Sequence, residues 1–201
     1  MTSPNDTIAE GLSAALTSLD EGKDMSQLTA QQRTQVDALI KSEWPKLERF
    51  FRSKVPYGDI QDVAQNTLLA YVKRVGTPIK DQRGYLWQIA RNQVADMYRR
   101  RRVLPDGFDS SVHSVMNFGP TMSSVINRKN QLTKALQSLA LDQQTAIELK
   151  YGEGLTDSEA AIALEVSVAT YKRYVSAGLS TLRDQYGVTD LEQLGDAYRN
   201  G

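Results

Sequence analysis

The chain has 201 residues, 40% of them hydrophobic and 24% charged, and its formal net charge is zero. This balance is typical of a soluble globular protein with one medium or two small domains, and it excludes disorder from end to end. With no cysteine and one histidine, His113, the chain cannot build a thiolate metal site, a disulfide framework or a Cys–His nucleophile pair. Most catalytic chemistry built on soft ligands is therefore excluded, and we expect no metal and no cofactor.

The N-terminal residues are acidic where a signal peptide needs a basic end. The sequence also lacks the roughly 20 consecutive apolar residues of a membrane span. These features predict a cytoplasmic protein without membrane insertion.

The zero net charge hides an uneven distribution along the chain. Residues 71–103 carry a net charge of +7, whereas residues 1–31 carry −4 and residues 142–201 carry −5. A basic block inside an otherwise neutral or acidic chain indicates contact with a polyanion such as nucleic acid.

Helical periodicity dominates the sequence, which predicts an all-α fold. We expect two small helical domains, over 32–102 and 131–186, joined by a flexible linker over 103–130 that is rich in Ser, Gly and Pro. An N-terminal extension (1–31) and a C-terminal tail (187–201) complete the chain.

Two long helices are expected in the first domain. Over 59–75, apolar residues recur every three or four positions, and Gly76 to Pro78 should end the helix. Over 84–102, one side is apolar and the other polar. The expected inward residues are Ile60, Val63, Ala64, Leu68, Tyr71, Val72 and Val75 in the first helix, and Leu86, Ile89, Ala90, Val94 and Met97 in the second.

The second domain contains a candidate helix-turn-helix. Thr156 and Glu159 fit a capping box, and Ser167 fits a second N-cap. Helices over 157–164 and 168–184 would then be joined by a tight turn, the spacing of a DNA-binding pair.

The basic helix has two interpretations. Its arginines could pair with phosphates while Tyr85, Trp87 and Tyr98 offer faces for unpaired bases; alternatively, it is a solvated basic face with core aromatics. The run of four arginines without acids at i+4 favours nucleic acid. Asp59 and Asp62 could be paired catalytic carboxylates, but no nearby His, Lys or metal ligand accompanies them, so we expect a docking surface.

Three segments together resemble the extracytoplasmic-function sigma factors of bacterial RNA polymerase. DIQDVAQNTLLAYVKR (59–74) resembles their core-binding helix, and RGYLWQIARNQVADMYRRRR (83–102) resembles the helix that reads and melts the minus-ten element. Residues 135–183 resemble sigma region four, which holds the helix-turn-helix. The resemblance covers about 35–184 and implies a chain that recognises promoter DNA for RNA polymerase core and catalyses nothing itself.

The resemblance also implies roles for individual residues. The loop from Gly76 to Arg83 would capture a flipped base, and the linker would thread toward the polymerase cleft. An anti-sigma factor is a further expected partner. The implied core-binding residues are Asp59, Asp62, Gln65, Asn66 and Leu69; those for minus-ten DNA are Lys80, Arg83, Tyr85, Trp87, Arg91, Asn92, Asp96, Arg99 and Arg100; those for minus-thirty-five DNA are Ser167, Thr170, Lys172, Arg173 and Ser176.

Some positions depart from the family pattern. Gln61 and Asn66 replace usual acids, so the docking strip is less negative. Glu165 stands where the turn usually has Gly, which predicts a left-handed residue or a different turn. Tyr174, Ala177 and Leu179 replace usual arginines, which predicts fewer phosphate anchors.

Two other functions fit parts of the pattern. A stand-alone helix-turn-helix regulator would bind operators without polymerase, but it would not need the arginine-rich helix. An all-α adaptor would use the Asp59 strip to bind proteins and would not bind DNA at any salt concentration.

Overall fold

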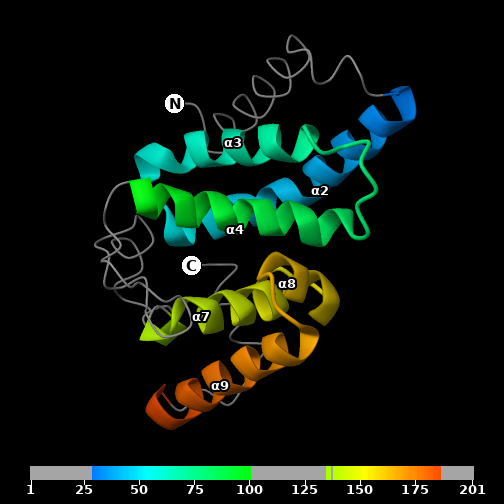
Figure 1. The fold of residues 1–201 in the computed structure, drawn as a ribbon. Coiled ribbons are helices and arrows are strands. Elements are labelled where there is room, and N and C mark those ends of the chain that lie inside the picture. The colour runs from blue at the N-terminus through cyan, green and yellow to red at the C-terminus, as the bar shows by residue number, and fades with distance from the viewer. Residues whose placement is uncertain (1–28, 101–134, 137, 187–201) are drawn as a thin grey trace.

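The computed structural model describes residues 29–100, 135–136 and 138–186, and its named elements are all helical (Figure 1). The all-α prediction is confirmed for this part of the chain. The first unit contains α2 (Ala30–Lys54), η1 (Tyr57–Asp59), α3 (Ile60–Val72) and α4 (Gln82–Arg100); the second contains α7 (Leu141–Ile147), the π-helical turn η3 (Glu148–Gly152), α8 (Asp157–Ala163) and α9 (Val168–Tyr186).

The predicted linker, His113 and both terminal segments lie outside the described residues. None of the helices described is long and apolar enough to cross a bilayer.

The first unit is a three-helix layer in which both predicted helices are present. All the predicted inward residues of α3 and α4 are buried, except Val75, which follows α3 and packs partly against the core. α3 ends at Val72 because Arg74 to Thr77 form a tight turn in which Gly76 has φ +98°. α2 begins in a capping box of Thr29 and Gln32, and its boundaries were not predicted.

The helix-turn-helix of the second unit forms as predicted. α8 starts in the capping box of Thr156 and Glu159, and Ser167 Oγ accepts from Thr170 N at 3.1 Å to cap α9. Between the helices, Glu165 has φ +57°. The Glu165 N–H donates to the Ile162 carbonyl oxygen, and the Val166 N–H donates to the Ala161 carbonyl oxygen. These two bonds close α8 in a Schellman-type turn. The predicted left-handed residue is therefore confirmed.

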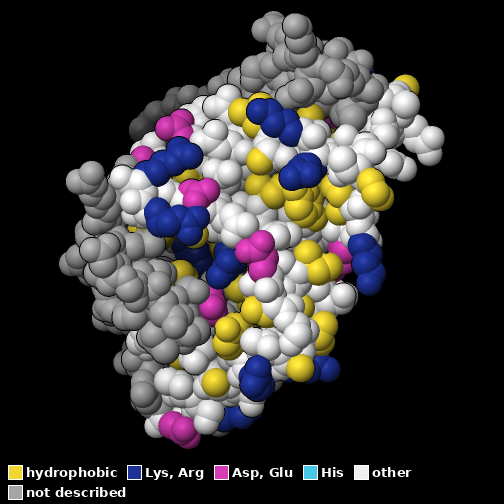
Figure 2. Space-filling model, in the orientation of Figure 1, with side chains coloured by type: hydrophobic (Ala, Val, Ile, Leu, Met, Phe, Trp, Pro, Cys, Tyr) yellow, Lys and Arg dark blue, Asp and Glu magenta, His cyan; other side chains and the backbone are white. Residues whose placement is uncertain are grey.

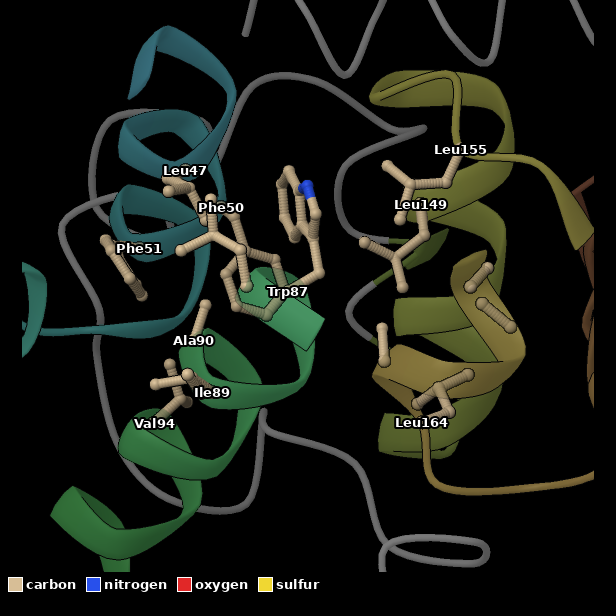
Figure 3. Packing of buried hydrophobic residues seen from close by; sticks show 14 of the residues in the cluster. Leu47, Phe50, Phe51, Trp87, Ile89, Ala90, Val94, Leu149, Leu155 and Leu164 are labelled. Atoms are coloured by element: carbon tan, nitrogen blue, oxygen red, sulfur yellow. The ribbon is translucent and has the colours of Figure 1, made fainter. Parts of the chain in front are cut away.

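The two units pack directly against each other. α4 lies between α3 and α8 (Figure 1), and buried apolar residues of both units form one cluster. Figure 3 shows Trp87 pointing into the space between Phe50 of α2 and Leu149 and Leu155 of the second unit.

Gly84 permits this close approach of the two units. A Cβ at this position would lie 3.1 Å from both the Glu159 carbonyl oxygen and the Ile162 Cβ. The missing side chain therefore allows α4 and α8 to pack closely at their backbones.

Candidate functional site

The expected docking residues occupy one side of α3. Asp62, Gln65 and Asn66 are exposed, and Asp59 and Leu69 are half-buried. The opposite side of α3 is packed in the core of the first unit. The helix thus presents a mildly acidic surface with an apolar edge.

The expected DNA-contacting residues of α4 and the preceding loop fall into two groups. Arg99 and Arg100 at the C-terminal end of α4 are exposed, and Asn92 and Asp96 earlier in the helix are half-buried. Lys80 is exposed in the loop before α4. Arg99 pairs with Asp96 one turn earlier. This C-terminal part of α4 is a basic surface open to solvent.

The aromatic residues correct the expectation of open stacking faces. Trp87 is 1% exposed, packs edge-on against Phe50 at 5.5 Å between ring centroids, and donates from Nε1 to Glu43 Oε2 at 3.0 Å. Tyr98 is buried and donates to the Lys54 carbonyl. Tyr85 is half-buried against Tyr71. In this arrangement Trp87 is a core residue, because its ring completes the junction between the units.

Arg83 connects the two units through its guanidinium group. Nε lies 3.0 Å from Glu43 Oε2 in α2, and Nη1 lies 3.1 Å from Glu159 Oε2 in α8. Nη2 donates to the Glu153 carbonyl at 3.2 Å. Burial favours the neutral form of Arg83, but the two carboxylates outweigh it and raise its pKa.

Arg91 and Gln88 make a second set of contacts across the junction. Arg91 Nη2 donates to Asp142 Oδ1 at 3.0 Å, and its Nη1 lies 4.0 Å from Glu165 Oε2. Gln88 donates to the same Glu165 carboxylate. Figure 2 shows basic and acidic side chains next to one another where α4 meets the second unit.

Two further ion pairs across the junction were not predicted. Lys54 pairs with Glu148, with both side chains almost fully buried, and Arg49 Nη2 lies 2.6 Å from Glu153 Oε2. A signal was available, since Glu43 and Lys54 continue the apolar stripe of Leu47 and Phe50 at helical spacing. Charges on such a stripe indicate buried partners.

The expected recognition residues gather on α9. Ser167, Lys172, Arg173 and Ser176 are exposed, and Thr170 is half-buried. Lys172 lies 3.7 Å from Asp157 of α8. Among the three departures at this helix, Leu179 is buried in the core, whereas Ala177 is exposed and Tyr174 is half-buried.

The fold resembles two solved structures of similar size. One is CnrH in complex with the cytosolic domain of CnrY (TM-score 0.56, 21% identity, covering 82% of this chain and 90% of that one). The other is the sigma factor RpoE in complex with the anti-sigma factor NepR from Bartonella quintana (TM-score 0.56, 21% identity, covering 81% and 100%). This likeness concerns the fold.

Sequence comparison matches the second unit to a known family and most of the chain to one relative. Residues 129–182 match the family described as Sigma-70, region 4. The chain is 28% identical over 144 residues to the ferric citrate uptake sigma factor FecI of Escherichia coli (strain K12), covering 65% of this chain and 79% of that protein. Together with the fold, these matches support an extracytoplasmic-function sigma factor. Sigma factors act in transcription initiation, and DNA binding and association with RNA polymerase are properties of this family.

Glu43 of this sigma factor gives a pH-dependent prediction. Burial raises its pKa, but contacts from Lys46, Trp87 and Arg83 outweigh burial and lower the pKa below 4.5. A lowered pKa in the folded state stabilises the fold above the unfolded value, and this contribution is lost as pH falls through the folded value. We expect Glu43→Gln to cost about 2 kcal/mol at pH 7, and the difference from wild type to shrink as pH falls below 4.5.

The measurement is urea unfolding of both proteins over that pH range. Glu48→Gln is the matched control, because the described ion pair of Glu48 is with Arg52 of the same helix. It should change the unfolding free energy by less than about 0.5 kcal/mol. A Glu43→Gln difference that stays constant on acidification would contradict the assigned ion pairs.

Proposed function

We propose that this sigma factor binds RNA polymerase core through α3, reads the minus-ten and minus-thirty-five promoter elements, and promotes DNA melting. The observation that carries the proposal is the set of three surfaces in one chain. These are the exposed acidic side of α3, the basic end of α4 and the capped helix α9. Polymerase would supply the chemistry, and this chain the recognition.

The minus-ten function is supported by the exposed end of α4. Arg99 and Arg100 can pair with the phosphates of a separated strand, and Asn92, earlier in the same helix, has a side chain able to bond a base edge. Flipping the first base costs a few kcal/mol, which contacts to the base and the following strand offset.

The minus-thirty-five function is supported by α9. Its N-terminus carries exposed Ser167 with Lys172 and Arg173, so it can meet a phosphate while polar side chains reach base edges. Because few basic residues surround it, this helix alone should bind DNA weakly.

Transcription in vitro tests the whole function. Purified chain and core polymerase should together transcribe a subset of a pooled promoter library, and the active members should yield both promoter elements. Binding to operator DNA without core, combined with no transcription, would instead identify a stand-alone regulator. Absence of any DNA binding at low salt, with or without core, would identify a protein-binding adaptor.

Core binding is tested by charge reversal on α3. Asp62→Lys should weaken binding to core about fivefold or more, because it places a cation on the acidic surface. Affinity is measured by titrating labelled chain with core. The matched control is Asp37→Lys on α2, where Asp37 pairs only with neighbouring Lys41 among the described ion pairs. Equal affinity of the two variants, with helicity preserved, would refute the docking assignment.

Strand binding is tested at the end of α4. Asn92→Ala and Arg99→Ala should each reduce open-complex formation about tenfold while leaving core binding unchanged, since these side chains are expected to hold the melted strand. Permanganate reactivity of promoter thymines measures the melting. Lys41→Ala, which removes an exposed cation from α2, is the control. Melting by Asn92→Ala and Arg99→Ala equal to wild type would contradict the assignment.

A further inference from the structure

The packing of the two units covers part of the proposed minus-ten surface. Arg83 and Arg91, both assigned to DNA, are held by Glu159, Asp142 and Glu165 of the second unit. A carboxylate and a phosphate oxygen bind a guanidinium group in the same way. DNA phosphates and these carboxylates therefore compete for the same donors.

The other proposed surfaces stay open in this arrangement. Asp62 and Gln65 on α3 are exposed, as are Lys172 and Arg173 on α9. Figure 1 shows α3 and α9 on opposite sides of the contact between α4 and α8. The contact thus covers the N-terminal half of α4 and leaves the core-binding and minus-thirty-five faces accessible.

Glu165 is an independent indication that this sequence favours the contact between α4 and the second unit. Its backbone has φ +57°, which is unfavourable for a side-chain-bearing residue and would suit glycine. Its carboxylate reaches Gln88 and Arg91 across the junction. A glycine at this position would remove the unfavourable backbone conformation of a side-chain-bearing residue, but it would also lose the contacts with Gln88 and Arg91.

We infer that the free sigma factor is held in a closed, self-inhibited state in which carboxylates of the second unit occupy the minus-ten arginines in place of DNA phosphates. This inference rests on the proposed function and concerns its regulation. Binding to core at α3 is possible in the closed state, whereas engaging the minus-ten strand requires the two units to separate.

A disulfide lock tests the closed state in the full chain. Because the natural sequence has no cysteine, Gly84→Cys combined with Ile162→Cys introduces one specific pair. The Cβ positions are 3.1 Å apart, a few tenths of an ångström below the usual range for a disulfide of about 3.5–4.5 Å. Mild oxidation should crosslink this pair. Gly58→Cys with Ile162→Cys is the control that should not crosslink, since Gly58 has open space around it.

The oxidised lock should lose most promoter melting with core, and reduction should restore it. Binding to core should be equal in both redox states. The closed state is refuted if the crosslinked chain melts promoters as well as the reduced chain. It is also refuted if the pair fails to crosslink in a free chain whose oligonucleotide affinity equals that of wild type, because that affinity shows that the cysteine at position 84 has not itself opened the contact.

A second measurement needs neither core nor a crosslink. Glu165→Asn keeps a residue that tolerates a left-handed backbone and removes the carboxylate. We expect it to bind a fluorescein-labelled single-stranded oligonucleotide of mixed sequence at least about threefold more tightly than wild type at low salt. Asp184→Asn is the control, because it removes the same charge from α9, where the carboxylate accepts only from Ser180 among the hydrogen bonds of the described residues. Equal affinity of the two variants would overturn the inference.

The proposed function and the closed state can be refuted independently of each other. A wild-type chain that supports no transcription with core refutes the proposed function. Crosslink yield and the oligonucleotide affinities still decide whether the closed state exists and whether it masks the arginines.

Discussion

The arrangement of the two units depends on Arg83. One guanidinium group joins Glu43 of the first unit to Glu159 and the 153–154 backbone of the second. Removing either carboxylate leaves the partly buried guanidinium group with one anionic partner in place of two, so the pair of contacts favours this one arrangement of the units. The same group is available to DNA only when Glu159 releases it.

Different forces act within and between the units. Within each unit, apolar stripes of neighbouring helices pack together, and water cannot replace that contact. Between them, Trp87 and Leu149 add an apolar part, but Arg91 and Arg83 form ion pairs in which each arginine stays about one-fifth exposed. Water, salt or a phosphate can exchange with such pairs at modest cost. The Lys54–Glu148 pair of the same junction is almost fully buried, so separation of the units must also return these two charges to water.

Features set by neighbouring residues could be predicted from the sequence. The capping box of Thr156 and Glu159, the apolar stripes of α3 and α4 and the left-handed Glu165 each depend on residues within a few positions. The junction could not be predicted, because Lys54 and Glu148 are 94 residues apart and nothing local encodes their pairing. For the same reason Trp87 was expected to stack on bases, although its environment comes from both units.

The zero net charge of the chain is reflected at the junction, where basic residues of the first unit pair with acidic residues of the second. The block over 71–103 carries +7 and the segment over 142–201 carries −5, and in the fold Arg83 and Arg91 of the first meet three carboxylates of the second. Because these two arginines are neutralised internally, the chain attracts DNA less strongly at long range than it would with all of the basic block unpaired. Separating the units restores the basic field at the helix assigned to the melted strand. If binding to polymerase core causes that separation, the chain gains its full affinity for DNA only in the complex with core. The free chain then binds DNA only weakly in the absence of polymerase.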